Sequence, residues 1–403
     1  MATKKKLLQA AAGNAGGDPA KYLITHQHSG KIWDIENDYA DVTSTFLPSN
    51  TTYWAGSNEH LFNPWQDDGY RSKYIGFGGW GRYGAIGGAI WDINNASSQW
   101  TGYNNYDGTV FSFGGTGNAI VTKIVPLGNS KNFFWFRVED NLEVGVNRIT
   151  NPTSSNNGSQ VIASNSIRHL ASWGDVVVYQ LNTAPYTLRL ASFYGVAGSS
   201  ATAASTSLVS TSGTLSGFSN SGATPAISKT GNVIAVYDGA ANSSAGAIRV
   251  FDDHNIAEYN GSSKVLGNGT QLAFSSSVRS IATGVIGEVV AVSDDDRWIA
   301  ASYRRTSSPY YGIGLWDRNN SNAFTDVTVP VGSGSNARPR GIVFYPDNDT
   351  FFMSGYNSAQ CLECSASAGS YTRNFSSFGA DAESKMGSSM GATVLPPDWT
   401  DGY

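Results

Sequence analysis

The sequence has little charge, little cysteine and little histidine. Of its 403 residues only 14% are charged, and there are two cysteines and five histidines. The net charge of −5 comes with no basic stripe, which argues against nucleic-acid binding. No run of about 18 apolar residues occurs, so the sequence predicts no membrane insertion.

Glycine and aromatic residues are abundant instead. The chain contains 46 Gly, 11 Trp, 20 Tyr and 18 Phe, with many Ser, Thr and Asn. Glycine turns and aromatic strand positions favour an all-β protein. No long segment places apolar residues at helical spacing.

One pattern recurs along the chain: a β-prone strand, a turn, and a second strand that often ends in an aromatic residue followed by Asp. We count seven copies, whose second strands recur about every 55 residues. A repeat of this length that carries about four strands is typical of a propeller blade. The predicted second strands are 30–35, 88–93, 141–149, 186–193, 246–252, 312–317 and 359–366. Each follows a predicted first strand, at 21–27, 73–79, 132–140, 175–181, 232–239, 297–303 and 349–356.

A leading strand precedes most of these pairs. The predicted leading strands are 119–129, 167–173, 223–231, 287–296 and 340–348. The first pair starts at Tyr22 without a leading strand, and segment 391–403 resembles the leading strand 340–348. The sequence therefore predicts a single seven-bladed β-propeller over residues 20–403. In it the C-terminal strand completes blade 1, which removes exposed sheet edges.

The body resembles WD-repeat propellers through a recurring Trp-Asp pair. The pairs are Trp33-Asp34, Trp91-Asp92 and Trp316-Asp317. The Gly-His element of true WD repeats is absent, so the resemblance implies a WD-repeat-like architecture rather than membership of that family.

Three groups of residues are candidates for metal or redox sites. Cys361 and Cys364 form a CxxC without a second pair for zinc, and strand positions three apart point to opposite faces. His26 and His28 share a strand face but lack a third ligand, and the run Asp294–Asp296 favours a solvated turn over a calcium loop. We predict no metal and no cofactor.

No catalytic motif stands out, since the sequence has neither a nucleophile elbow nor a phosphate loop. A carboxylate pair built from different blades, as a glycosidase would need, stays open. We predict a non-enzymatic protein with no catalytic residues.

Two loops between first and second strands have the composition of recognition surfaces. They combine aromatic residues and Arg with Gly or Ser, which suits sugar stacking or protein binding. The alternative is that the rings pack between blades while the Arg side chains are solvated. The candidate recognition residues are Trp80, Arg82, Tyr83, Arg304, Arg305, Tyr310 and Tyr311.

Residues 4–17 read KKKLLQAAAGNAGG. This segment resembles the short arm that opens many virion proteins of marine bacteriophages, especially those of cyanobacteria. The resemblance implies a phage structural protein whose arm, residues 1–19, binds the particle. We interpret the segment as a mature arm because its apolar part stops at Gln9, which is short for a signal peptide. The predicted attachment residues are Lys4, Lys5, Lys6, Leu7 and Leu8.

These readings together predict a virion appendage on the exterior of the phage particle: a capsid decoration or knob, or a tail-associated or fibre protein. Its partners would be other virion proteins, held through the arm, with host surface glycans as a further candidate. The first alternative is a carbohydrate-binding or carbohydrate-cleaving propeller, secreted or virion-borne. The second is a propeller scaffold inside a cell.

Overall fold

The computed structural model describes the β-rich body of the chain in part. The described residues are 21–26, 30–46, 60–61, 74–80, 86–92, 121–126, 133–138, 141–146, 159–163, 167–173, 176–181, 188–192, 225–228, 230–238, 247–252, 269–274, 278–279, 290–305, 311–329, 338–356, 361–375 and 391–395. The predicted arm, residues 1–19, lies outside them.

The described strands between Tyr22 and Ser192 lie in four antiparallel sheets, the first of which also contains the C-terminal strand. The first sheet has the order β27-β1-β2-β3, with β27 (Gly391–Leu395), β1 (Tyr22–His26), β2 (Gly30–Asp34) and β3 (Ala40–Asp41), followed by α2 (Thr43–Phe46). The next contains β4 (His60–Leu61), β5 (Tyr74–Trp80) and β6 (Ile86–Asp92). A third contains β7 (Val121–Pro126), β8 (Phe133–Val138), β9 (Asn141–Val146) and β10 (Ser159–Ala163). A fourth contains β11 (Ile167–Trp173), β12 (Val176–Leu181) and β13 (Leu188–Ser192).

The described strands in the second part of the chain lie in three sheets that carry most of the described side chains. The β15 sheet contains β14 (Ala226–Ile227), β15 (Ile234–Asp238), β16 (Ala247–Phe251) and β17 (Thr270–Ala273). The β20 sheet contains β18 (Val278–Arg279), β19 (Val290–Val292), β20 (Trp298–Arg305), β21 (Tyr311–Asp317) and β22 (Ala323–Thr328), with the 3-10 turn η5 (Arg318–Asn320). The last sheet contains β23 (Arg338–Phe344), β24 (Thr350–Tyr356), β25 (Leu362–Ser365) and β26 (Ser370–Asn374).

The strand pairs predicted from the repeat are confirmed. The antiparallel pairs are β1–β2, β5–β6, β8–β9, β12–β13, β15–β16, β20–β21 and β24–β25. The predicted leading strands correspond to β7, β11, β14, β19 and β23, each paired with the strand that follows it. The C-terminal strand β27 pairs with β1, from Tyr22 opposite Leu395 to His26 opposite Gly391. The protein is therefore all-β, with several four-stranded antiparallel sheets.

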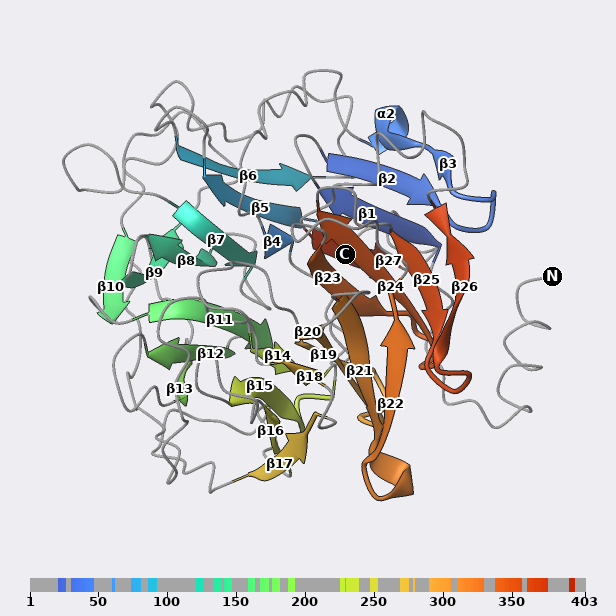
Figure 1. The fold of residues 1–403 in the computed structure, drawn as a ribbon. Coiled ribbons are helices and arrows are strands. Elements are labelled where there is room, and N and C mark those ends of the chain that lie inside the picture. Colours follow the sequence, from blue (N-terminus) through green and yellow to red (C-terminus); the bar gives the residue numbers. More distant parts are fainter. Residues whose placement is uncertain are drawn as a thin grey trace, which may run out of the picture.

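The sheets follow one another around the molecule, and the first sheet lies beside the last (Figure 1). Successive residues of a strand point to opposite faces, so a strand covered on both sides is apolar throughout. In β20, Ile299 and Ala301 pack toward the β15 sheet, whereas Trp298 and Ala300 pack toward the last sheet. The described core thus lies between sheets.

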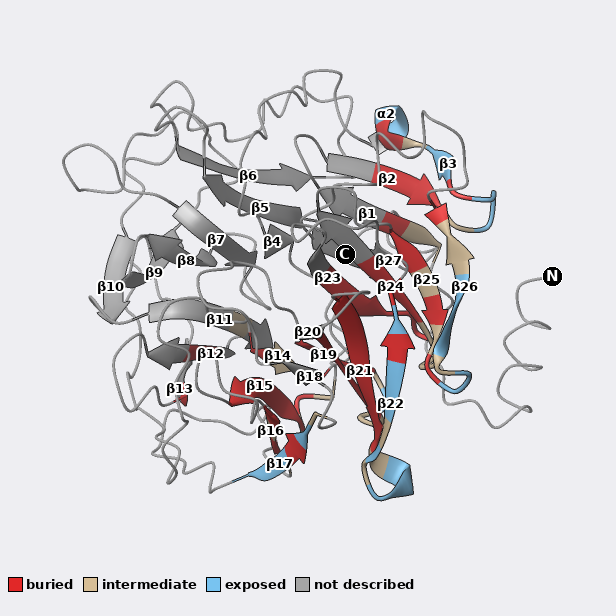
Figure 2. Cartoon of the chain, viewed as in Figure 1, coloured by how far each residue is buried: buried red, intermediate tan, exposed pale blue. Residues whose placement is uncertain are grey.

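Exposure rises toward the outermost strands of these sheets. In Figure 2 β15, β21 and nearly all of β16 are buried, whereas β3, β17, β22 and β26 carry exposed residues. None of the helices that the structure describes is long and apolar enough to cross a membrane.

Candidate functional site: the turn surface

The best described polar surface is built from turns at one end of the sheets. Connections between successive antiparallel strands alternate between the two ends of a sheet. The turn before a first strand and the turn after a second strand therefore share one end, which we call the turn surface. It comprises the turns that follow β2, β14, β19, β21, β23 and β25.

Three of these turns share one backbone pattern. They start at Ser228, Ser293 and Tyr345, and the N–H of each donates to the carbonyl oxygen five residues on, at 2.9, 2.9 and 2.7 Å. The fourth residue of each turn has positive φ: Gly231 at 75°, Asp296 at 63° and Asn348 at 61°. Gly, Asn and Asp tolerate this conformation best, so the local sequence dictates the turn.

Side chains close the same turns. The Ser228 hydroxyl accepts a hydrogen bond from the Val233 N–H at 3.0 Å, and Ser293 accepts one from the Trp298 N–H at 2.8 Å. In the third turn the Asp347 carboxylate accepts from the N–H groups of Asp349 and Thr350, at 3.0 and 2.8 Å. These polar residues therefore satisfy backbone groups where the strands end.

The Trp-Asp pairs act in a similar way at the turns after second strands. Asp34 accepts from the Glu36 N–H at 3.1 Å, and Asp317 accepts from the Asn319 N–H at 3.1 Å. The preceding tryptophans, Trp33 and Trp316, are buried between sheets. The recurring motif thus combines a core ring with a turn acceptor.

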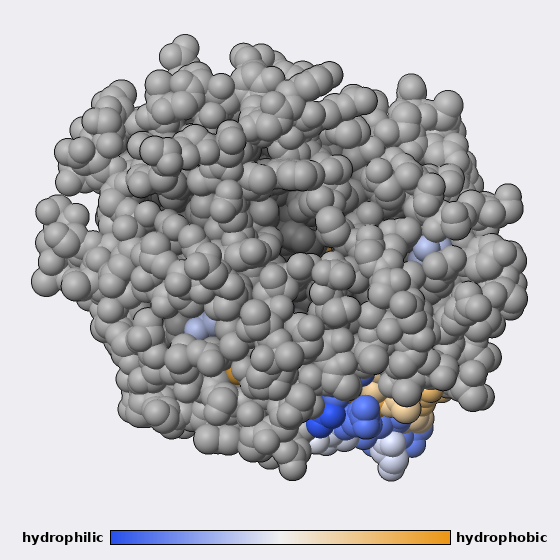
Figure 3. Space-filling view, turned by 60° about the vertical axis from the view of Figure 1, so that its left-hand side comes forward, coloured by the Kyte–Doolittle hydropathy of each residue, from blue (hydrophilic) through white to orange (hydrophobic). Residues whose placement is uncertain are grey.

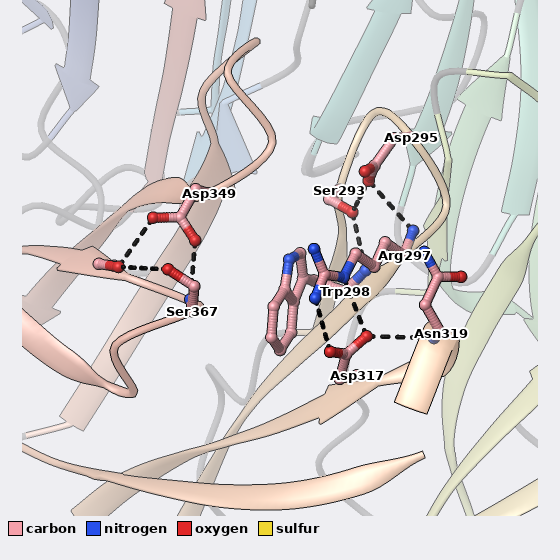
Figure 4. Close-up of polar contacts among 9 residues, drawn as sticks. Ser293, Asp295, Arg297, Trp298, Asp317, Asn319, Asp349 and Ser367 are labelled. Atoms are coloured by element: carbon pink, nitrogen blue, oxygen red, sulfur yellow. Dashed lines mark hydrogen bonds and ion pairs between the residues drawn. The ribbon is translucent and has the colours of Figure 1, made fainter. Parts of the chain in front are cut away.

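Arg297 and Asp317 form the central ion pair of Figure 4. Two guanidinium nitrogens of Arg297 donate to the two carboxylate oxygens, at 3.0 and 2.7 Å, and the guanidinium lies 4.6 Å from the centroid of the Trp298 ring. The hydrogen bonds from Arg297 lower the pKa of Asp317 below its usual range, and the same bonds raise the pKa of Arg297. The carboxylate is therefore held in its charged form.

Other contacts cross from sheet to sheet. The Thr230 hydroxyl lies 2.8 and 2.7 Å from the two carboxylate oxygens of Asp296, and the Asp295 N–H donates to the Asn348 side-chain oxygen at 3.0 Å. Arg318 bonds to the Asp252 carboxylate. These bonds connect the β15 sheet to the β20 sheet, and the β20 sheet to the last sheet. The run Asp294–Asp296, predicted as a turn between strands, is confirmed as one.

A shallow pocket opens beside the Arg318–Asp252 pair. Its lining residues are Val250, Asp252, Thr270, Leu272, Arg318 and Asn322.

Figure 3 shows hydrophilic and apolar described residues side by side at the lower edge of the molecule. Among the residues that the structure describes, no group of three His, Cys, Asp or Glu side chains could hold a metal ion.

The predicted recognition residues are only partly described. Trp80 ends β5, and Arg304 and Arg305 end β20. Tyr311 is the first residue of β21 and is 5% exposed, so it belongs to the strand rather than to the loop and presents little surface to a ligand. The other candidates lie outside the described residues. They are His28, the recognition residues Arg82, Tyr83 and Tyr310, and the attachment residues Lys4, Lys5, Lys6, Leu7 and Leu8.

The two cysteines point to opposite faces of the last sheet, as their spacing predicts. Cys361 packs with Leu23 and Trp33 of the first sheet, whereas Cys364 packs with Ile313 and Leu315 of the β20 sheet. Both side chains are buried. Burial raises the pKa of the Cys364 thiol well above its ordinary value, which keeps this thiol protonated.

Sequence comparison finds no match: no family model matches the chain, and no curated protein does. Among solved structures, it is similar to the β-propeller domain of Cps50 (Swd1) from Myceliophteria thermophila, with 12% identity, a TM-score of 0.50, and coverage of 86% of this chain and 93% of that one. Hsv2 from Kluyveromyces lactis has 13% identity and a TM-score of 0.43, covering 84% of this chain and 91% of its own. At such identities the similarity concerns the fold alone, and the fold it indicates is that of β-propeller proteins.

Proposed function

We propose that the sheets are the seven blades of one propeller, which the C-terminal strand closes. Support comes from β27, which pairs with β1 although the two strands lie at opposite ends of the chain. Further support comes from the side chains between the first and last sheets, where Leu23 and Trp33 share a buried cluster with Val343 and Phe352. A ring in which the last sheet packs on the first accounts for both contacts.

We further propose that this disc is the body of a non-enzymatic virion appendage protein, attached to a phage particle by its N-terminal arm. The attachment part of this proposal rests on the resemblance of residues 4–17 to a virion arm, and its non-enzymatic part is supported by the use of charge on the turn surface. The described carboxylates of Asp34, Asp296, Asp317, Asp347 and Asp349 all accept hydrogen bonds from turns or from neighbouring sheets. Carboxylates that accept hydrogen bonds within turns and between sheets have a structural role. This favours a rigid body without acid–base catalysis.

The opposite end of the sheets is the proposed recognition face. β20 leaves the turn surface at Trp298 and ends at Arg305, so the loop after it emerges at the far end. Trp80 ends β5 at the corresponding loop, before β6. These positions keep Trp80, Arg304 and Arg305 in the proposal as contacts for host surface glycans, while other virion proteins would bind the arm.

Deletion of the arm tests this function. A chain lacking residues 2–18 and the full chain are each supplied to assembling particles, and incorporation is measured by quantitative mass spectrometry of purified particles. We expect the truncated chain to fold, as judged by circular dichroism, and to be absent from particles. A matched control that keeps the arm and carries Trp80→Ala and Arg305→Ala should be incorporated normally.

Equal incorporation of the truncated chain would overturn the attachment role of the arm. If no particle contains the full chain, the virion assignment itself fails. The carbohydrate-binding or carbohydrate-cleaving alternative would then be tested with glycan arrays and hydrolysis assays on the purified protein.

A further inference from the structure

Tyr39 occupies an unusual backbone position at the turn between β2 and β3. Asp38 and Tyr39 have φ of 57° and 58°, and the Ala40 N–H donates to the Asn37 carbonyl oxygen at 3.1 Å. The loop between β2 and β3 runs over residues 35–39, and positive φ at its last two positions favours Gly, Asn or Asp. A bulky residue there is strained, so other contacts must hold it.

Those contacts come from the last sheet. The Tyr39 hydroxyl lies 2.8 Å from the Tyr345 hydroxyl and donates to the Glu363 carboxylate. The Arg373 guanidinium lies 5.1 Å from the centroid of the Tyr39 ring and also pairs with Asp38. Tyr39 and Glu363 are 324 residues apart in the sequence, so this contact joins the two ends of the chain.

Burial determines which groups donate in the hydrogen bonds of Tyr39 and Tyr345. Tyr39 is 7% exposed and Tyr345 is 6% exposed, and burial raises the pKa of both phenols above the ordinary value. Both hydroxyls therefore keep their protons and act as donors. The other carboxylate oxygen of Glu363 accepts from the Thr372 hydroxyl at 3.2 Å, which fixes the acceptor.

The strand that follows the arm is held on both edges. β1 pairs with β2 and with β27 along its whole length, from Tyr22 to His26. A pull on the N-terminus acts along β1, so the hydrogen bonds of both ladders resist it together. The turn after β2 carries Asp38 and Tyr39, which fix the same sheet to the last one.

We infer that Asp38, Tyr39, Glu363 and Arg373 form a mechanical latch that passes tension on the N-terminus from the first sheet into the last sheet. The use of this latch in a particle rests on the proposed attachment through the arm. The latch itself is a property of the body and is measured on the purified protein. Failure of arm-dependent incorporation and failure of the latch are therefore separate results.

Optical tweezers test the latch in the full chain. One handle is attached at the N-terminus and the other at Ala368→Cys, an exposed position in the last sheet, where labelling is selective because Cys361 and Cys364 are buried. At fixed force, Tyr39→Phe should raise the rate of the first opening step about tenfold or more, because a hydrogen bond to a charged group is lost. Tyr371→Phe, which alters a tyrosine that is 44% exposed on β26, is the matched control and should leave this rate unchanged.

A double-mutant cycle separates the latch from general weakening. Glu363→Ala should accelerate the same step, and adding Tyr39→Phe to it should accelerate it less than Tyr39→Phe does in the native chain, because both variants break the contact between Tyr39 and Glu363. Independent, multiplying effects of the two variants would overturn the latch, as would a first opening rate that neither variant changes. If Tyr39→Phe unfolds the chain, the same comparison with Arg373→Lys keeps the test valid.

Discussion

The boundary between the β20 sheet and the last sheet differs from the boundary between the last and first sheets. At the former, the buried residues are mostly aliphatic, such as Ile313, Leu315 and Met353. At the latter, Trp33, Tyr39, Tyr345, Phe352 and Phe375 dominate the buried cluster, and two of them join hydroxyls across the boundary. The hydroxyl pair of Tyr39 and Tyr345 places a buried polar contact across the second boundary.

The difference follows from how each boundary is connected. The β20 sheet and the last sheet are neighbours in the sequence, because β22 ends at Thr328 and β23 begins at Arg338. The strands β1 and β2 of the first sheet pack on the last sheet across most of the chain, with Tyr39 and Tyr345 306 positions apart, whereas β27 of the same sheet follows the last sheet in the sequence. Aliphatic packing is non-directional. A boundary between strands far apart in the sequence, such as β2 and β25, therefore gains register from hydrogen bonds of defined geometry.

The largest expected effects come from substitutions of two adjacent phenylalanines, each of which packs at one of the two boundaries. Phe351 and Phe352 are both 0% exposed, and they point to the β20 sheet and to the first sheet respectively. Each change to Ala should lower the free energy of unfolding by about 3–5 kcal/mol in denaturant titrations. Hydrogen exchange should then distinguish them: Phe352→Ala speeds exchange in β1 and β2, whereas Phe351→Ala does not. Faster exchange of β1 in both variants would mean that the boundaries are not independent.

Substitution of a glycine between the β15 and β20 sheets should lower stability by a smaller amount. A Cβ at Gly314 would lie 2.9 Å from ring atoms of both Phe324 and Trp316. Gly314→Ala should therefore cost about 1–3 kcal/mol by overpacking, while exchange in β1 stays unchanged. Thr270→Ala on the exposed strand β17 serves as the control and should change stability by less than about 0.5 kcal/mol in the same titration.

Local patterns were enough to predict the strands and their pairing. Apolar alternation and Pro, Asp or Gly at strand ends mark each pair, and the likeness of segment 391–403 to a leading strand predicted its pairing with β1. The opposite orientation of Cys361 and Cys364 followed from strand geometry alone. These features depend on neighbours in the sequence.

Features that depend on distant residues could not be predicted. Tyr39 stands in an ordinary Asp-Tyr sequence, and nothing near it indicates Glu363 or Arg373 as partners. The bond from Thr230 to Asp296 likewise joins two turns of adjacent sheets. The sequence places Tyr311 in a loop because Ser, Pro and Tyr precede it, whereas its pairing with Arg304 makes it the start of a buried strand.

Alkaline pH should act on the boundary between the first and last sheets. The pKa values of Tyr39 and Tyr345 are raised chiefly by burial, so in the unfolded chain these phenols ionise at lower pH, near about 10. Above that pH the unfolded chain binds fewer protons than the folded chain, and stability falls by up to about 1.4 kcal/mol per pH unit for each tyrosine. Denaturant titrations between pH 9 and 11.5 should show a shallower loss for Tyr39→Phe than for Tyr371→Phe. Parallel curves would exclude Tyr39 as a source of the alkaline loss.

The smallest expected effect concerns a single turn. Ser293 accepts from the Trp298 N–H and donates to the Asp295 carboxylate at 2.6 Å, so Ser293→Ala should lower the free energy of unfolding by about 1 kcal/mol. Ser370→Ala, at an exposed position of β26, should have almost no effect. Because this turn belongs to the β20 sheet, exchange in β1 should stay at its native rate in Ser293→Ala. Faster hydrogen exchange in β1 would mean that the hydrogen bonds of the turn surface couple sheets over a longer range than the latch does. A route for such coupling exists, because the Asp295 N–H donates to Asn348 of the last sheet.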